Sequence, residues 1–264
     1  MAIGEIALGQ YVPGDSFLHR LDPRTKIGLV TGFIVLMFVV ETWWGYGVGA
    51  GMVALGLVAG RLSPRWVLRG LRPIVVLIAI SAVLNAFWTE GRTLWQWGPL
   101  RLTAEGVERA GMMGLRLVLL VAGASLLTLT TSPIDLTDAI ERLLTPLRRV
   151  GVPAHELAMM MSIALRFVPT LAEEAERIMK AQMARGAAFD RGSLWARARA
   201  LVPLLVPLFV SAFRRADDLA LAMEARCYRG GEGRTRLRQL RMRRRDWATL
   251  VAFAVVAGGV GAVL

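Results

Sequence analysis

Five long runs of apolar residues divide the chain. They cover residues 27–40, 45–60, 74–88, 111–130 and 247–264, and segments with polar or charged residues separate them. A helix needs about 20 mostly apolar residues to cross the hydrocarbon core of a membrane. The pattern therefore predicts an all-α membrane protein with about five transmembrane helices.

The segment between the fourth and fifth runs, residues 132–246, combines apolar and charged stretches. Its first part predicts a short helix over residues 134–150, opened by Pro133. Acidic residues come early in this helix and basic residues late, the order that the helix macrodipole favours. We therefore divide the chain into an N-terminal region with four spans (1–131), this polar segment, and a C-terminal span (247–264).

Two long amphipathic helices follow within the same segment. The first is predicted over residues 153–184 with a bend at Pro169, and the second over about 194–226 with bends at Pro203 and Pro207. Each begins apolar and becomes charged. Because the apolar part of the second helix is too short to cross a membrane, both helices are expected to stay on one side of it.

The positions of the basic residues predict the orientation of the chain. The net charge is +12, and 21 of the 32 basic residues lie in residues 132–246, whereas loop 41–44 has none and loop 89–110 has three. Cytoplasmic loops are rich in arginine and lysine. The N-terminus and residues 132–246 are therefore expected to be cytoplasmic, and the arginine run at 234–245 is expected to lie on anionic lipid headgroups.

Several classes of chemistry are excluded by the composition. With Cys227 as the one cysteine and His19 and His155 as the only histidines, the chain cannot assemble a thiolate or imidazole metal cluster. Neither lysine, Lys26 nor Lys180, follows a glycine, so the chain is not itself a P-loop ATPase. The arginines do not alternate with aromatic residues, which argues against a nucleic-acid partner.

Two features of the spans are unusual. Arg116 lies within an apolar run, where a guanidinium is costly, so we expect it to reach the membrane interface or to have a partner inside the protein. The glycine pairs Gly47/Gly51 and Gly56/Gly60 have the spacing that lets helices approach closely in lipid. They predict either packing within this chain or a surface for a second membrane protein.

The two long helices end alike. A small residue, an arginine and another small residue close each of them: Ala184, Arg185 and Gly186 in the first, and Ala225, Arg226 and Cys227 in the second. One such end is ordinary, because an arginine suits the negative end of a helix and glycine suits the position after it. Two of them on neighbouring amphipathic helices indicate a docking device with two cationic tips.

These motifs, together with residues 11–26 (YVPGDSFLHRLDPRTK), resemble the transmembrane T-component of energy-coupling factor (ECF) transporters, the family that includes the cobalt-transporter subunit CbiQ. The likeness covers nearly the whole chain. It implies that the two long helices are coupling helices, and that Arg185 and Arg226 insert into two ABC-type ATPase subunits. The second motif departs from the family pattern at Cys227, because cysteine disfavours the left-handed conformation that glycine adopts after a helix.

The resemblance further implies a second partner, a membrane-embedded substrate-binding S-component. Apolar residues in the first halves of the two coupling helices are expected to face it: Leu157, Met160, Met161, Ala164, Val168, Leu204, Leu205, Leu208 and Phe209. The chain would be a non-catalytic, multi-pass subunit of an importer for vitamins or transition-metal ions in a bacterial or archaeal cell (inner) membrane. It would bind no cofactor, because ATP and magnesium are used by the partner ATPases.

Two other classes of protein fit these residues less well. An intramembrane enzyme needs polar groups that converge inside the bilayer, but the spans offer little beyond Asn85 and Arg116, with no carboxylate or histidine pair for acid–base catalysis. A self-contained channel or permease needs a pore, and few polar groups are available to line one, although backbone groups could do so.

Overall fold

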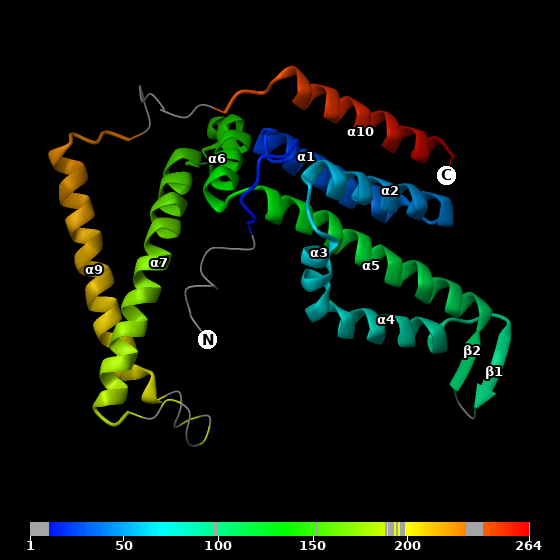
Figure 1. Cartoon of the computed structure of the whole chain (residues 1–264), viewed down its shortest axis with the longest axis horizontal. Coiled ribbons are helices and arrows are strands. Elements are labelled where there is room, and N and C mark those ends of the chain that lie inside the picture. Colours follow the sequence, from blue (N-terminus) through cyan, green and yellow to red (C-terminus); the bar gives the residue numbers. More distant parts are fainter. Residues whose placement is uncertain are drawn as a thin grey trace. The chain divides into compact units, whose positions relative to one another are not determined.

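The computed structural model describes residues 11–97, 100–151, 153–187, 199–230 and 240–263, together with residues 189, 193 and 195 (Figure 1). These residues are almost entirely helical, which confirms the all-α membrane fold. They form two compact units. The first unit contains the described residues of 11–132 and 240–263, and the second contains those of 133–230.

Helix α5 is the centre of the first unit, and α1, α2, α3 and α4 all pack against it, while α10 packs against α1 (Figure 1). The elements of this unit are α1 (Pro23–Val39), α2 (Trp43–Gly60), α3 (Pro64–Leu71), the short 3-10 helix η2 (Arg72–Ile74), α4 (Val75–Trp88), strands β1 (Thr93–Trp97) and β2 (Leu100–Thr103), α5 (Ala104–Thr130) and α10 (Arg244–Val263).

Helices occupy all five places where spans were predicted. Among the residues that the structure describes, four helical segments are long and apolar enough to cross a membrane: Trp43–Gly60, Pro64–Trp88, Ala104–Thr130 and Arg244–Ala262. Helix α1 has 17 residues, which gives it a length of about 26 Å against a hydrocarbon thickness of about 30 Å. The number of helices that cross the membrane therefore stays a prediction.

Two local features were not predicted. The third span extends backwards through η2 into α3, and Figure 1 shows α3 at a steep angle to α4; Pro73 lies at this bend, where it lacks the N–H group of a regular helix. The loop after α4 contains an antiparallel hairpin of β1 and β2. Thr103 ends the hairpin and caps α5, accepting a hydrogen bond from the Gly106 amide at 3.1 Å.

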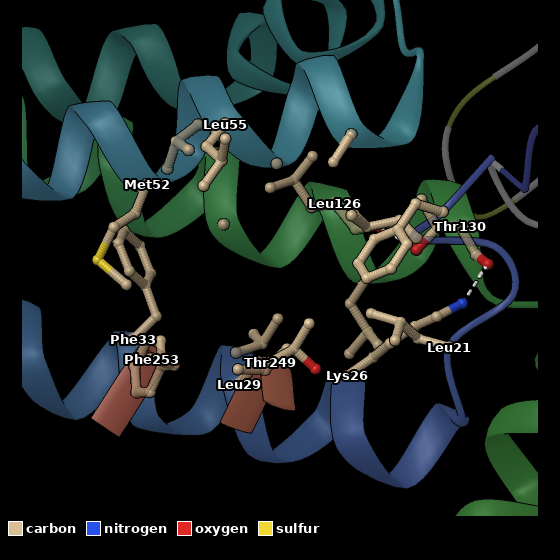
Figure 2. A pocket seen from close by; sticks show the side chains of 18 of the residues that line it. Leu21, Lys26, Leu29, Phe33, Met52, Leu55, Leu126, Thr130, Thr249 and Phe253 are labelled. Carbon is tan, nitrogen blue, oxygen red and sulfur yellow. Dashed lines mark hydrogen bonds between the residues drawn. The ribbon is translucent and has the colours of Figure 1, made fainter. Parts of the chain in front are cut away.

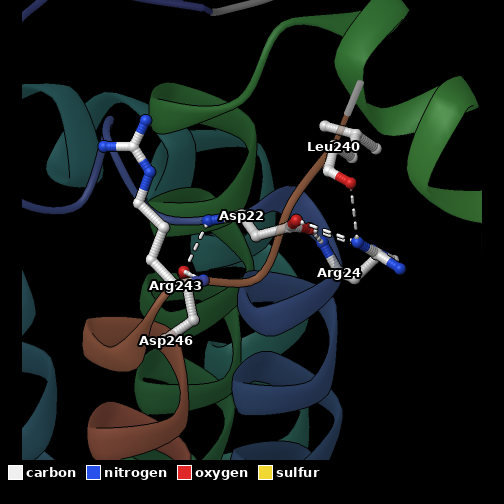
Figure 3. A network of polar contacts seen from close by, with 5 residues as sticks. All are labelled: Asp22, Arg24, Leu240, Arg243 and Asp246. Carbon is white, nitrogen blue, oxygen red and sulfur yellow. Dashed lines mark hydrogen bonds and ion pairs between the residues drawn. The ribbon is translucent and has the colours of Figure 1, made fainter.

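The start of α1 is fastened to the start of α10 by two buried carboxylates (Figure 3). Asp22 caps α1 by accepting a hydrogen bond from the Arg24 amide at 3.0 Å, and pairs with the Arg24 guanidinium at 3.1 Å. Asp246 accepts hydrogen bonds from the backbone amides of Asp22 at 2.8 Å and of Arg243 at 2.7 Å. Asp246 thus satisfies amides at the beginnings of two helices at once.

Lys26 joins α1 to the end of α5. Its ammonium donates to the carbonyl oxygen of Thr130 at 2.8 Å and to the Thr131 hydroxyl at 3.3 Å. The carbonyls at a helix C-terminus have no partner within the helix and carry partial negative charge, so an ammonium stabilises them. The conspicuous LDPRTK sequence therefore has a structural role, because it fastens α1 to two other helices.

Arg116 has its partners inside the protein, which confirms one of the two expectations for it. Its guanidinium donates to the Tyr46 hydroxyl at 3.0 Å and to the Val40 carbonyl at 2.7 Å. Tyr46 is fully buried, and its hydroxyl donates to the same carbonyl at 3.1 Å. Arg116 therefore stabilises the turn between α1 and α2. Its guanidinium is held by these groups and does not line an open pathway for a solute.

The two glycine pairs of α2 differ in what lies next to them. A Cβ atom at Gly56 would lie 2.6 Å from the side chain of Leu126 in α5, so this glycine allows the two helices to approach closely. Gly47 and Gly51 have no atom within 4 Å of that position. Packing within the chain therefore explains Gly56, and it does not explain the first pair.

The second unit consists of α6 (Pro133–Leu144), the 3-10 helix η3 (Thr145–Val150), α7 (Ala154–Ala184) and α9 (Val202–Ala225). The first two cover the predicted short helix, and α7 matches the first predicted long helix. Helix α9 begins at Val202, and a turn at Leu201 separates it from the helical residues 199–200. The predicted start of this helix near residue 194 lies outside the described residues, which lack 194 and 196–198, and so do residues 234–239 of the arginine run.

Pro203 was predicted to bend the interior of one long helix, but the chain has a turn at Leu201 and a new helix begins after it. This proline lies in the first turn of α9, where no backbone hydrogen bond is lost because the first amides of a helix have no partner in it. Pro169 and Pro207 do lie inside α7 and α9.

The first prediction concerns the carboxylate that fastens α10. Asp246→Ala leaves two amides without acceptors and should lower the free energy of unfolding by about 1–3 kcal/mol. Thermal unfolding of the detergent-solubilised protein measures this as a lower apparent melting temperature. Asp15→Ala is the control: Asp15 pairs with Arg20 at the surface, and such pairs contribute about 1 kcal/mol or less. Equal melting temperatures for the two variants would contradict the assigned role.

Candidate functional site

Helices α7 and α9 pack against each other and run in opposite directions (Figure 1). Apolar residues of both helices line a shallow seam, among them Phe167 and Leu171 of α7 and Leu219 of α9. At one end of the seam Arg215 of α9 pairs with Glu174 of α7 at 2.6 Å, and both side chains are partly buried. A partly buried charged hydrogen bond fixes the register of the two helices.

The end of α7 is a Schellman motif built on the predicted Ala184-Arg185-Gly186 sequence. Gly186 has a left-handed backbone with φ of 89°. Its amide donates to the Met183 carbonyl at 3.0 Å, and the amide of Ala187 donates to the Gln182 carbonyl at 3.0 Å. These are the two hydrogen bonds that define the motif. Arg185 is therefore the last residue before the chain turns away from the helix.

The end of α9 has the same geometry, although cysteine replaces glycine. Cys227 has φ of 53°, and its amide donates to the Glu224 carbonyl at 2.8 Å. The amide of Tyr228 donates to the Met223 carbonyl at 3.0 Å. The departure at Cys227 therefore leaves the shape of the helix end unchanged, and the cost is a left-handed conformation that an L-residue with a side chain disfavours.

The two ends are placed apart. Tyr228, which follows the end of α9, lies with its hydroxyl 3.4 Å from His155 at the start of α7. Arg226 is therefore at the end of the helix pair where α7 begins, and Arg185 is at the opposite end. Both tripeptides, Ala184 to Gly186 and Ala225 to Cys227, are exposed to solvent. The structure thus presents two separate arginine tips.

Contacts that the sequence did not predict support the second tip. His155 Nδ1 lies 3.1 Å from a carboxylate oxygen of Glu141 in α6, and the His155 Nε2 faces the Tyr228 hydroxyl. Glu141 is buried. Residues of α6 and α7 therefore meet the distant Tyr228 at the end of the helix pair where Arg226 lies, and no periodicity or motif could have indicated this contact.

The charged half of α7 has the ion pairs expected from its spacing. Glu176 pairs with Lys180 at 2.8 Å, and Glu173 lies 3.9 Å from Arg177. The hydrogen bond from Lys180 lowers the pKa of Glu176. These pairs are at the surface and contribute little stability. This half of α7 is therefore polar and exposed to solvent, and it ends at Arg185.

The first halves of α7 and α9 expose most of the apolar residues proposed to face an S-component. Exposed members are Leu157, Met160, Met161, Ala164, Val168, Leu205 and Phe209, while Leu208 is half-buried. Leu204 is only 8% exposed and does not belong to this surface. It lies on the same side of α9 as Leu208 and Ala212, the side that turns toward α7.

Among the exposed apolar residues of α9 that were missed are Val206 (58% exposed), Val210 (55%) and Phe213 (67%). They extend the apolar surface to another side of the helix. The signal was present in the sequence, because residues 202–210 of α9 contain no charged residue on any side. We define the exposed apolar surface of the coupling helices by Leu157, Met160, Met161, Ala164, Val168, Leu205, Val206, Phe209, Val210 and Phe213.

Comparisons with known proteins show the family of the chain. The sequence model of a family described as "Cobalt transport protein", CbiQ, matches residues 14–237. The protein named energy-coupling factor transporter transmembrane protein EcfT from Thermosediminibacter oceani is 58% identical over 255 residues, covering 97% of this chain and 96% of the relative. Proteins of the same name from Ruminiclostridium cellulolyticum and Clostridium kluyveri are each 53% identical, covering 92% and 96% of this chain and 91% and 95% of the relatives. The chain therefore belongs to the CbiQ family and is a transmembrane component of the energy-coupling factor transporter type.

Proposed function

We propose that this chain transmits ATP-driven motion from two ABC-type ATPase subunits to a membrane-embedded S-component that binds vitamins or transition-metal ions. The observation that supports this most directly is the pair of matching helix ends. Each presents an exposed arginine on a Schellman motif, and the two lie at opposite ends of one antiparallel helix pair. Two identical contacts placed apart suit two copies of one kind of partner.

Arginine suits such a contact because its planar guanidinium forms two parallel hydrogen bonds to a carboxylate and stays charged in a groove. After each arginine the chain turns sharply away from the helix axis. The helix end with its arginine can therefore enter a groove on a partner. We propose that Arg185 and Arg226 each pair with acidic side chains on one ATPase subunit. Closure of the ATPases on ATP would then displace both tips together.

The seam between α7 and α9 would carry this displacement. The Glu174–Arg215 pair and the apolar residues beside it hold the two helices in one register. A force on either tip therefore acts on the pair as a whole. The exposed apolar surface of the coupling helices would transfer the motion to the S-component, since buried apolar area drives association. Because the helices are antiparallel, this surface covers α7 toward the Arg226 tip and α9 toward the Arg185 tip.

The polar groups of the spans fit a non-catalytic subunit. Arg116 and Lys26 are held by structural hydrogen bonds, and Asn85 donates to the carbonyl of Ser81 within its own helix at 2.8 Å. We propose that ATP and magnesium act only in the partner ATPases. The N-terminus and both arginine tips would be on the cytoplasmic side of a bacterial or archaeal cell membrane, as the distribution of arginines predicts.

The second prediction tests the arginine tips. Arg185→Glu and Arg226→Glu each place a repelling charge in an acidic groove and should weaken binding of the ATPase subunits by at least about 30-fold. Binding is measured by co-purification and by interferometry on the detergent-solubilised chain. Arg214→Glu is the matched control, since Arg214 is an exposed arginine within α9 and not at its end. Unchanged ATPase binding in the Arg185/Arg226 double variant would refute the docking role.

Cys227 provides a direct reporter for the second tip. It is the only cysteine of the chain and is exposed, so a maleimide labels it in the isolated protein. Bound ATPases should protect it, and Arg226→Glu should abolish the protection. Full labelling in the assembled complex would place the ATPases elsewhere.

The third prediction tests the backbone at Cys227. Cys227→Gly relieves a left-handed conformation and should stabilise the end of α9 by about 1 kcal/mol, with ATPase affinity retained. Cys227→Val places a β-branched residue there and should weaken ATPase binding, because the turn that presents Arg226 is strained. Cys227→Ala shares the cost of cysteine and should behave as wild type. Equal affinity for all three variants would show that the turn is not required.

The fourth prediction concerns the exposed apolar surface of the coupling helices. Leu205→Ser and Phe209→Ser together should weaken capture of an S-component by at least about tenfold, because apolar area is lost from the contact. ATPase binding should be unchanged. Leu143→Ser is the control, since Leu143 is exposed to a similar extent as Leu205 (45% against 43%) but lies in α6, outside the two coupling helices. Capture that falls equally in the control would contradict the proposed surface.

A further inference from the structure

An apolar cavity of about 300 Å³ lies inside the first unit, among α1, α2, α5 and α10 (Figure 2). Each of these helices contributes residues over about two turns, so the cavity is an elongated slot roughly 10 Å long. Its walls include Phe33 and Leu29 of α1, Met52 of α2, Leu126 of α5 and Phe253 of α10. Neither the docking tips nor the proposed partner surface uses it.

The two ends of the slot differ chemically. Figure 2 shows Phe33, Met52 and Phe253 gathered at one end, and Lys26 with Thr130 at the other. The lining therefore changes within two helical turns from apolar side chains to the Lys26 ammonium, which is buried and bonded to Thr130 and Thr131. A matching ligand is a single apolar chain with an anionic group at one end.

The slot opens sideways between two membrane-spanning helices. Leu55 of α2 lines it and is 70% exposed, and Val256 of α10 lines it and is 41% exposed. Both lie within segments that are apolar enough to cross a membrane. The opening is thus level with the hydrocarbon of the bilayer, where lipid is the surrounding medium. If the slot were empty, its lining side chains would lack dispersion contacts on one side, and an acyl chain would supply those contacts.

Basic residues dominate the end of the unit where Lys26 lies. In residues 11–26, 61–72 and 240–246, which adjoin the helix ends there, eleven residues are basic and three acidic. Arg245, one helical turn before the lining residue Thr249, contacts the carbonyl of Arg20. Its Nε is buried and has no acceptor within the part of the chain that the structure describes. A phosphate placed here would meet complementary charge.

From these observations we infer that the slot is a binding site for an anionic phospholipid, with one acyl chain between α2 and α10 and the phosphate beside Lys26 and Arg245. Bound lipid would complete the packing of α10, which in the described structure contacts only α1 to a substantial extent. The site does not depend on the proposed function, because it lies in the other unit and shares no residue with either arginine tip.

The test uses the full chain in nanodiscs that contain either phosphatidylglycerol or phosphatidylcholine, each with a photoreactive acyl chain. Cross-links should map to residues 52–59 and 249–256. Ala252→Phe fills the slot from α10 and should reduce cross-linking there about tenfold. The matched control is Ala254→Phe, because Ala254 is exposed on the same helix and does not line the slot.

Headgroup selectivity is tested separately. Phosphatidylglycerol should be preferred over phosphatidylcholine, and Arg245→Gln should lower that preference about fivefold, the value expected for one basic side chain near a phosphate. Arg244→Gln, an exposed neighbour, should leave it unchanged. Equal cross-linking in the Ala252 and Ala254 variants would refute the slot. Equal labelling by the two lipids would refute the anionic assignment. Loss of labelling only when an S-component is added would assign the slot to that protein.

Discussion

The antiparallel packing of α7 against α9 decides where the functional residues lie. If the two helices ran in the same direction, Arg185 and Arg226 would end side by side and could serve only one groove. Because they run in opposite directions, the same tripeptide pattern appears at both ends of a single rod. The apolar seam and the Glu174–Arg215 pair hold this arrangement, and the proposed transfer of motion depends on their keeping it.

In the first unit the corresponding constraint is the satisfaction of polar groups where water is scarce. Lys26, Arg116 and Asp246 are charged residues that are buried or lie among apolar helices, and each bonds to backbone groups at a helix end. An unpaired charge in such surroundings would cost several kcal/mol. These residues therefore work as fasteners between helices, and the charges that can meet a partner lie on exposed surfaces such as the two tips or at the basic rim of the slot.

Much of this could be predicted from the sequence, because helices are local structures. The apolar runs indicated the spans, and the spacing of charges and prolines indicated α6 and α7 and the C-terminal half of α9. The errors also have local causes: Pro203 was assigned to a helix interior when it lies in a first turn, and Leu204 was counted as exposed when it shares the inward side with Leu208. The contacts of His155 with Glu141 and Tyr228 were beyond prediction, because they depend on how three helices pack.

Cys227 adopts a backbone conformation that its sequence disfavours. The sequence alone makes it an imperfect copy of the glycine at the first tip, and its side chain argues against a left-handed turn. The structure places it in that turn nevertheless, with both hydrogen bonds of the motif intact. Since a left-handed cysteine costs about 1 kcal/mol or more, other contacts must hold the turn. The nearest is Tyr228, the next residue, which reaches back to His155 at the start of α7. The turn at the second tip therefore depends on tertiary contacts. The turn at the first tip does not need them, because glycine adopts the left-handed conformation without steric cost.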